Sequence, residues 1–281
     1  MSRLAGKVAI ITGGASGIGE ATARLFASHG STVVIADIQD ALGLSVANSI
    51  SPPGRCTYVH CDVREEHQLA AAVRHTIQHH KHLDIMFSNA GTLGPFTGIL
   101  DVDMSDLDNL LAVHLRGMAA AIKHAGRAMV DGGVKGSIIC TGSVAAEKGG
   151  FAPVAYTAAK HGVLGLVRAA AGELGGKGVR VNCVSPFGVA TPMSCGPHVI
   201  KAEVLERLVS EAAVLKGGVL KAADIAAAAL FLASDDSAFV SGQNIAVDGA
   251  VTAVYGGMAG VLYQKDVAAA VATATAAAGH P

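Results

Sequence analysis

Short apolar runs alternate with longer segments of helical spacing along most of the chain. The apolar runs predict strands at residues 8–12, 32–37, 56–60, 85–89, 136–141, 179–185 and 244–248. Segments 18–28, 65–80, 104–129, 152–174 and 222–233 have the spacing and composition typical of helices. Because strands and helices alternate, we expect an α/β fold: a doubly wound parallel sheet of about seven strands with helices on both faces.

Two stretches break this alternation. The connection from 186 to about 215 follows the sixth predicted strand and is rich in Gly and Pro before a short helical pattern. Ligands bind at the carboxyl ends of strands in such sheets, so we interpret this long connection as a candidate substrate lid. The Gly- and Ala-rich tail, 251–281, is consistent with a helix docked on a neighbour or with a frayed terminus. We therefore expect one domain over 1–250, followed by a tail.

Composition and charge favour a buried sheet and argue against several partners. Hydrophobic residues make up 51% of the 281 residues and charged residues 15%, which suits a sheet covered on both faces and hints at subunit contacts. The formal net charge is −1 with no basic block, so a nucleic acid or an anionic membrane has no electrostatic support as a partner. No apolar run has the length of a transmembrane helix and no secretory signal is visible, which predicts a cytoplasmic protein.

The cysteines and histidines do not form a metal-binding pattern. The five cysteines include no C-x-x-C pair, and in a reducing compartment they are expected to be small packing residues. The twelve histidines show no ligand spacing, and the group His79, His80 and His82 is explained by a helix C-terminus. We predict no metal site.

A Gly-rich turn directly follows the first predicted strand and opens the first helix. Glycines permit a tight turn and close approach of the backbone to a pyrophosphate, while the helix N-terminus supplies amide donors. The residues of this turn that we expect to bind a dinucleotide are Gly13, Ser16, Gly17, Ile18 and Gly19. The position between strand and helix makes the motif more specific than a Gly-rich turn alone.

Asp37 ends the second predicted strand and bears on the choice of cofactor. Its carboxylate can accept hydrogen bonds from both adenosine ribose hydroxyls and would repel a 2′-phosphate. The next residues, Ile38 and Gln39, offer no cation, so we predict NAD rather than NADP. The alternative is that Asp37 only terminates a strand. The third and fourth strands are followed by Asp62-Val63 and Asn89-Ala90-Gly91 at the same edge. We expect these residues and Ile38 to contact the cofactor; the alternative for the two segments is that they are ordinary turn residues.

Three residues around the fifth predicted strand have the side chains that proton transfer needs. Ser143 comes just after that strand, and Tyr156 and Lys160 follow in a predicted helix at a spacing that puts them on one face. A free phenol has a pKa of about 10, and a nearby ammonium lowers that pKa toward the working range of a base. We predict Tyr156 as the general base and Ser143 as the group that holds the substrate oxygen.

Together these motifs resemble the short-chain dehydrogenase/reductase family in its single-domain, Rossmann-like form. The resemblance covers roughly residues 4 to 250 and includes the glycine turn, Asn89-Ala90-Gly91, Ser143 with Tyr156 and Lys160, and Asp248-Gly249. It implies that Tyr156 and Lys160 also contact the cofactor. It further implies a loop that holds the nicotinamide carboxamide, with contacts from Pro186, Gly188, Val189 and Thr191.

Segments 181–186 and 240–244 are most similar to plant members of this family that act on secondary metabolites. Those members include xanthoxin, secoisolariciresinol, isopiperitenol and borneol dehydrogenases and momilactone A synthase. The resemblance implies a secondary alcohol of a cyclic terpenoid, steroid-like or phenolic compound as substrate, and a homotetramer as the assembly.

One position departs from the family pattern. Where the family has Asn in the helix after the fourth strand, this chain has His114. In the family that Asn holds a water molecule that links the lysine to solvent. Imidazole can donate and accept a hydrogen bond, so His114 either supports a similar water chain as a fourth member of the site, or packs locally and weakens the proton relay.

The expected substrate pocket is apolar, with candidates at 92–96, 148–151 and Met193. The sequence thus predicts an NAD-dependent dehydrogenase that oxidises a secondary alcohol. Two alternatives remain: an NAD-binding protein with weak or no redox activity because of His114, and an NADPH-dependent ketone reductase, against which Asp37 argues.

Overall fold

The computed structural model describes residues 2–195 and 200–254. Its centre is one parallel sheet of seven strands in the order β3-β2-β1-β4-β5-β6-β7. The strands are β1 (Val8–Thr12), β2 (Thr32–Asp37), β3 (Cys56–His60), β4 (Ile85–Ser88), β5 (Ser137–Thr141), β6 (Arg180–Pro186) and β7 (Asn244–Val247). The order reverses direction between β1 and β4, which is where a doubly wound sheet opens a crevice for a ligand. The predicted fold class is confirmed.

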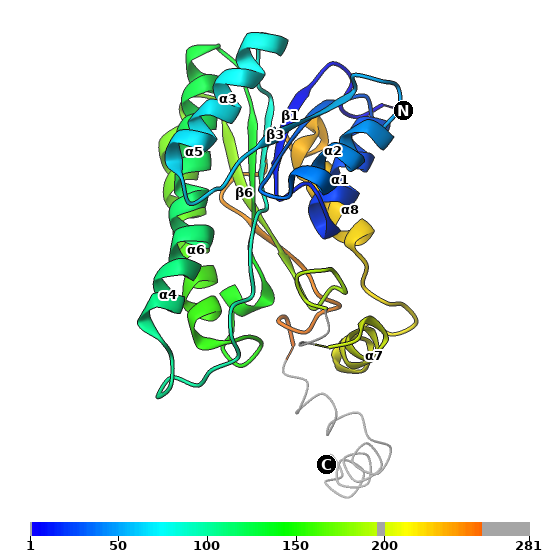
Figure 1. Ribbon diagram of the computed structural model, residues 1–281, viewed down its shortest axis with the longest axis vertical. Helices are drawn as coiled ribbons and strands as arrows, with labels where there is room; N and C mark the ends of the chain where they lie inside the picture. The colour runs from blue at the N-terminus through cyan, green and yellow to red at the C-terminus, as the bar shows by residue number, and fades with distance from the viewer. Residues whose placement is uncertain (1, 196–199, 255–281) are drawn as a thin grey trace, which may run out of the picture.

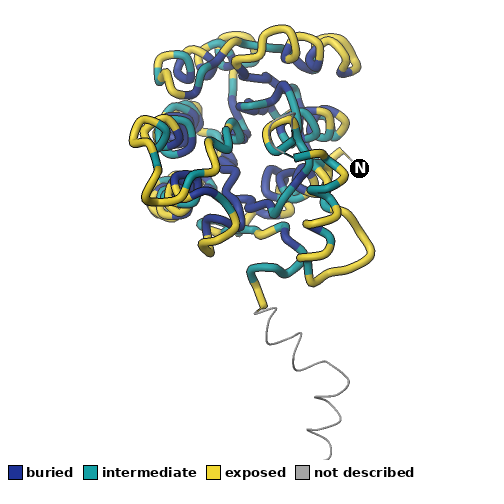
Figure 2. The backbone as a smooth tube through the Cα atoms, turned by 60° about the horizontal axis from the view of Figure 1, so that its bottom comes forward, coloured by how far each residue is buried: buried dark blue, intermediate teal, exposed yellow. Residues whose placement is uncertain are grey.

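Helices cover both faces of the sheet (Figure 1). One layer contains α3 (Glu66–His80), α5 (Gly117–Asp131) and α6 (Val154–Gly175), with α4 (Met104–Leu111) at its end. The other contains α1 (Gly17–Ser28), α2 (Asp40–Ser49) and α8 (Ala222–Ala233), and α7 (Ala202–Ala212) lies beyond the ends of the strands. Figure 2 shows the buried backbone between these layers and the exposed residues along their outer sides.

The apolar strands follow from this sandwich of layers. Alternate residues of one strand pack on opposite sides, as Ile10 does toward the α3–α5–α6 layer and Ile11 toward the α1–α2–α8 layer. Since both faces are covered, the strands are apolar throughout instead of alternating with polar residues.

The predicted elements agree with the structure apart from two larger differences and shifts of one or two residues at several element ends. The helix expected at 104–129 is interrupted by a π-helical turn, Ala112–Arg116, which separates α4 from α5. Helix α2 was not predicted, because Gly43 lowers its helical propensity; the Tyr58 ring occupies the place where a Cβ of residue 43 would stand. The strand expected to end at Asn89 ends at Ser88.

The candidate lid forms α7 and the segments on either side of it within 186–195 and 200–215. Of the predicted tail, residues 251–254 continue a turn after β7, and the rest lies outside the described residues. In the part of the chain that the structure describes, no helix has both the length and the apolar character to cross a membrane. The same residues contain no group of three or more His, Cys, Asp or Glu side chains arranged to hold a metal.

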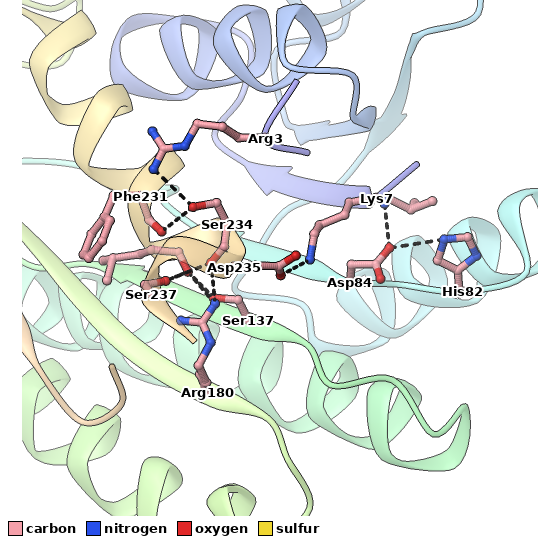
Figure 3. Close-up of polar contacts among 12 residues, drawn as sticks. Arg3, Lys7, His82, Asp84, Ser137, Arg180, Phe231, Ser234, Asp235 and Ser237 are labelled. Atoms are coloured by element: carbon pink, nitrogen blue, oxygen red, sulfur yellow. Dashed lines mark hydrogen bonds and ion pairs between the residues drawn. The ribbon is translucent and has the colours of Figure 1, made fainter. Parts of the chain in front are cut away.

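Polar contacts attach the end of α8 to the edge of the sheet where the strands begin (Figure 3). The carbonyl oxygen of Leu232, in the last turn of α8, accepts hydrogen bonds from Ser137 Oγ, Ser237 Oγ and Arg180 Nη2 at 2.8, 3.0 and 2.8 Å. Arg180 also reaches the carbonyl oxygens of Ser234 and Val240, at 3.3 and 3.4 Å. A half-buried guanidinium therefore satisfies the unpaired carbonyl groups at the end of α8.

Asp84 has a related role at the start of the central strands. Its Oδ2 accepts a hydrogen bond from the backbone N–H of Val8 at 2.7 Å and lies 3.2 Å from His82 Nε2. Lys7 and Asp235 pair nearby at 2.6 Å (Figure 3). These contacts fix the first strand and the end of α8 at the same edge.

Replacing Arg180 by Met should lower the free energy of unfolding by about 2 kcal/mol, because charge-assisted hydrogen bonds to half-buried carbonyl groups are lost while the side-chain length is kept. Chemical denaturation at fixed protein concentration measures the change. Arg168→Met, at an exposed position of α6, is the matched control and should change the free energy by less than about 0.5 kcal/mol. Equal effects of the two substitutions would contradict this account.

Candidate functional site

Two adjoining cavities lie at the carboxyl ends of the strands. The first, of about 340 Å³, lies at the place between β1 and β4 where the strand order reverses direction. The second, of about 780 Å³, is bordered by the carboxyl ends of β5 and β6 and by α7. They share Ile18, Thr141, Thr191 and Met193, so a ligand in one can touch a ligand in the other.

The first cavity is lined by most of the residues predicted to bind a dinucleotide. These are Gly13, Ser16, Gly17, Ile18, Asp37, Ile38, Asp62, Val63, Asn89, Ala90, Gly91 and Thr191. Gly19 lies beneath the turn instead, where a Cβ would collide with the carbonyl group of Gly13. Pro186, Gly188, Val189 and Tyr156 line the second cavity, and Lys160 lines neither.

The glycine turn is held so tightly that side chains do not fit. Gly13 and Gly17 have φ of 65° and 55°, and a Cβ at residue 13 would come within 2.7 Å of Ala90 Cα. Asn89 pins the turn: its Nδ2 donates to the carbonyl oxygens of Thr12 and Gly13 at 3.2 and 3.3 Å. Its Oδ1 accepts from Thr141 Oγ1 at 3.0 Å, which joins β1, β4 and β5 at one point.

Asp37 presents a buried carboxylate to the far end of this cavity. Its Oδ2 accepts from the N–H of Ala15 and its Oδ1 from the N–H of Gln39, each at 3.0 Å. Oδ1 also accepts from Gln39 Nε2 at 3.4 Å, whereas Oδ2 keeps a further lone pair with which the carboxylate can accept from a ligand hydroxyl. With the backbone donors at the start of α1 and the glycine cradle, these residues fit a dinucleotide.

Asp62 is less available than the sequence suggested. Its two oxygens pair with Arg64, Oδ2 with Nη2 at 2.6 Å, and this contact lowers the pKa of Asp62. Arg64 also donates through Nη1 to Asn109 Oδ1 at 3.1 Å. Both Arg64 and Asn109 line the cavity, and no motif in the sequence pointed to either.

Ser143 and Tyr156 meet at the inner end of the second cavity. Ser143 precedes a short 3₁₀ turn, Val144–Ala146, and its Oγ accepts from the N–H of Ala145 at 3.1 Å. The hydroxyl hydrogen of Ser143 therefore remains free to be donated. Burial raises the pKa of Tyr156 to about 12, and the nearby Ser143 hydroxyl acts on this pKa in the opposite direction.

Lys160 lies one turn after Tyr156 in α6 and is fully buried. Its Nζ donates to the carbonyl oxygen of Thr141 at 2.7 Å and lies 5.4 Å from the centroid of the Tyr156 ring. Burial lowers the pKa of Lys160 to about 8. The structure thus brings the predicted pair together, and the effect of burial on the pKa of Tyr156 exceeds any effect of the ammonium group.

His114 joins this group from the π-helical turn. Its ring lies edge-on to Tyr156, with centroids 5.2 Å apart and an interplanar angle of 80°. Its Nε2 is 2.7 Å from the carbonyl oxygen of Thr92 and 3.3 Å from the backbone nitrogen of the same residue. Because the shorter contact is to an oxygen that can only accept, we assign the hydrogen to Nε2, and Nδ1 is then a buried acceptor without a partner among the described residues. Burial and the charge of Lys160 lower the pKa of His114 to about 3, so the imidazole is neutral.

Among the described residues that line the second cavity there is no Asp, Glu, Lys, Arg or His. Of the candidates for a substrate pocket, Leu93, Phe96, Phe151 and Met193 line it, together with residues of the lid such as Leu205. Thr92 lines the first cavity, and Gly94, Pro95, Gly149 and Gly150 line neither. Lys148 was also expected here, but its Nζ reaches the carbonyl oxygen of Thr252 instead, at 2.5 Å.

The chain is similar to several plant proteins over most of its length. Residues 13–252 match the family model described as enoyl-(acyl carrier protein) reductase. Short-chain dehydrogenase reductase 3b of Arabidopsis thaliana is 55% identical, and the match covers 90% of this chain and 98% of the relative. Momilactone A synthase of Oryza sativa subsp. japonica is 51% identical, over 90% of this chain and 92% of the relative.

A third relative, (+)-borneol dehydrogenase 1 of Salvia officinalis, is 48% identical over 90% of this chain and 96% of the relative. Among solved structures, that of levodione reductase superposes with a TM-score of 0.80 at 29% identity, covering 90% of this chain and all of the other. The resemblance noted from the motifs is thereby confirmed. Together with the dinucleotide cradle and the placement of Ser143, Tyr156 and Lys160, these matches show that the chain belongs to the short-chain dehydrogenase/reductase family of oxidoreductases.

Proposed function

We propose that this protein is an NAD-dependent dehydrogenase that oxidises the secondary alcohol of a cyclic, apolar metabolite to a ketone. One observation carries this proposal. The hydroxyl of Ser143 and the phenol of Tyr156 both line a cavity whose described residues carry no charge and which adjoins the dinucleotide cavity. A substrate that fills the second cavity would therefore present one oxygen to Ser143 and Tyr156 and the adjacent carbon to the first cavity.

In the proposed reaction Ser143 and Tyr156 contact the substrate, and Lys160 supports Tyr156. Ser143 donates its free hydrogen to the substrate oxygen, and Tyr156 as phenolate takes the hydroxyl proton as the carbonyl bond forms. When bound, the oxidised nicotinamide supplies a positive charge and accepts the hydride. The Lys160 ammonium, 5.4 Å from the centroid of the Tyr156 ring, stabilises the phenolate by its positive charge.

The cavity favours a substrate with one polar group and a large apolar body. Phe96, Phe151 and Phe187 supply aromatic surface, and Phe151 and Phe187 pack edge to face with centroids 5.8 Å apart. The described part of the lining offers no side chain that could neutralise a carboxylate or phosphate of the substrate. Cyclic terpenoid, steroid-like and phenolic alcohols fit these conditions, and borneol, on which one relative is named to act, is a bicyclic terpenoid alcohol.

Asp37 supports NAD over NADP, because its carboxylate would accept from ribose hydroxyls and repel a 2′-phosphate. Arg64 lines the same cavity but is paired with Asp62 and Asn109, so its charge is already neutralised. The levodione reductase likeness leaves open a second direction, ketone reduction, and an NADPH-dependent reductase would have to overcome Asp37.

We also propose a homotetramer in the cytoplasm. The side chains of Leu111, Leu115, Ala119 and Leu166 border a shallow apolar depression on the outer side of the α5–α6 layer, which suits a subunit contact. Among the described residues all five cysteines are free thiols, consistent with a reducing compartment.

A second candidate function depends on what His114 does to the path of the proton. Its unpartnered Nδ1 can accept from a buried water molecule that continues to Lys160, and we propose this supporting role. If the ring instead interrupts the path of the proton, the protein binds NAD with little turnover.

Replacing Tyr156 by Phe should lower kcat for alcohol oxidation by about 100- to 10,000-fold, because the base is removed while the ring is kept. NAD affinity, measured by calorimetry, should change little. In the wild type, kcat/KM for oxidation should rise with pH from neutral to alkaline, since the phenolate fraction of a group whose pKa burial raises increases with pH. Turnover of the variant at the wild-type rate would refute the assignment of Tyr156.

The ratio of kcat/KM for NAD to that for NADP should be on the order of 100 or more, since a carboxylate facing a phosphate costs several kcal/mol. Asp37→Asn should reduce this ratio at least tenfold. Asp40→Asn, which removes the same charge from an exposed position nearby, is the control and should leave the ratio unchanged. Comparable efficiency with both cofactors in the wild type would show that Asp37 does not select the cofactor.

If His114 supports proton transfer, His114→Asn should lower kcat about tenfold, because the shorter side chain loses its contact with Thr92. Steady-state assays across a panel of cyclic alcohols, followed by NADH absorbance, measure the effect. A large gain in kcat would favour the second candidate function, in which the imidazole blocks the relay.

A further inference from the structure

The backbone of Ser143 is held by a buried hydroxyl on the neighbouring strand. The N–H of Ser143 donates to Ser185 Oγ at 3.1 Å, and Ser185, near the end of β6, is fully buried. The single hydroxyl hydrogen of Ser185 is in turn donated to Asn244 Oδ1 at 2.6 Å. Since Oδ1 can only accept, the direction of both hydrogen bonds is fixed.

The same Asn244 side chain reaches the other end of the turn that carries Ser143. Its Nδ2 donates to Glu147 Oε1 at 2.5 Å, and Glu147 directly follows the 3₁₀ turn Val144–Ala146. One amide on the last strand therefore contacts both ends of this turn, Ser143 through Ser185 and Glu147 directly. We call the three side chains of Ser185, Asn244 and Glu147 the bracket.

The turn has little room to shift within the bracket. A Cβ at Gly142 would overlap Ser185 Oγ and come within 2.6 Å of Cys183 Sγ, so the backbone before Ser143 packs directly on β6. Ser143 itself is extended, with φ of −174° and ψ of 160°. Any change in the distance between this backbone and β6 therefore moves Ser143 Oγ relative to Tyr156.

We propose that Ser185 and Asn244 are positioning residues that set where Ser143 stands relative to the substrate oxygen. This inference rests on the proposed function, in which Ser143 binds that oxygen. A displacement of about 1 Å in a group that orients substrate can reduce turnover by about 100-fold, so a bracket of hydrogen bonds is a sufficient device. Neither residue touches the dinucleotide cavity, so cofactor binding does not depend on them.

Ser185 and Asn244 could instead serve only to attach β7 to β6. This role can be tested separately, because Asn182 also attaches β7 to β6. Asn182, also fully buried on β6, donates through Nδ2 to the carbonyl oxygen of Val240 at 2.7 Å and accepts from the N–H of Gln243 at 3.1 Å. No hydrogen bond joins it to the turn of Ser143. Asn182→Ala is therefore the control for a loss of sheet stability alone.

The first experiment is a double-mutant cycle of Ser185→Ala and Ser143→Ala. Ser185→Ala alone should lower kcat by about 10- to 100-fold, with unchanged NAD affinity by calorimetry. It should also move the kcat/KM–pH profile to higher pH, because Tyr156 loses the contact that lowers its pKa. In the Ser143→Ala background, Ser185→Ala should cause no further loss. Additive losses, or an unshifted pH profile, would overturn the proposal.

The second experiment exchanges the partners at the exposed end of the bracket. Asn244→Asp places a carboxylate against Glu147 and should reduce kcat. Adding Glu147→Gln should restore it, because amide and carboxylate then pair with their positions exchanged, and the Asp carboxylate still accepts from Ser185. Asn182→Ala should lower the melting temperature without changing kcat or the pH profile. Failure of the double variant to recover, or an equal kinetic effect of Asn182→Ala, would count against the bracket.

Hydrogen exchange separates this inference from the proposed function, since it needs no turnover. Peptides covering 143–147 should exchange faster in Ser185→Ala and Asn244→Asp than in the wild type, and unchanged exchange would overturn the bracket whatever the enzyme's activity. Wild-type turnover in Ser143→Ala would overturn the proposed function. If Ser143→Ala turns over at the wild-type rate while Ser185→Ala and Asn244→Asp exchange faster, the bracket holds the turn without serving this reaction. That result would also overturn the positioning role.

Discussion

A fully buried ammonium group, that of Lys160, constrains the arrangement of the whole site. Removing a charge from water is costly, and among the described residues this ammonium group has one hydrogen-bond acceptor, the carbonyl oxygen of Thr141 at the end of β5. Burial, together with the charge of Lys160, lowers the pKa of His114, and burial raises the pKa of Tyr156, so both side chains are neutral beside the ammonium group. A bound ligand that brings compensating charge or hydrogen bonds to this region would relieve part of that cost.

The strands and the main site residues could be predicted because their signals are local. Strands covered on both faces are continuous apolar runs, and Tyr156 and Lys160 share a helix face by their spacing alone. The π-helical turn at Ala112–Arg116 could not be predicted, since it contains no Gly or Pro that would mark an interruption of the helix. Helix α2 was missed because Gly43 is required by the Tyr58 ring of a neighbouring strand.

The partners of the site residues escaped prediction because they are distant in sequence. Arg64 neutralises Asp62 locally, yet its contact with Asn109 needs the fold to bring α4 over the cavity. Ser185 and Asn244 are 59 positions apart, and Asn244 and Glu147 are 97 apart. Residue types at such separations have no spacing rule, whereas Lys148 was expected in the pocket from proximity in sequence to Ser143 and instead reaches Thr252.

The dependence of Ser143 on the last strand has a consequence for synthesis of the protein. Domains emerge from the ribosome at about 5–20 residues per second, so the 97 positions between Glu147 and Asn244 correspond to a delay of roughly 5–20 s. During that interval β1 to β5 can assemble around the dinucleotide cavity while the turn of Ser143 still lacks its bracket. A nascent chain would thus acquire the ability to hold its cofactor before it could orient a substrate, and binding energy from the cofactor would be available to guide the remaining strands into place.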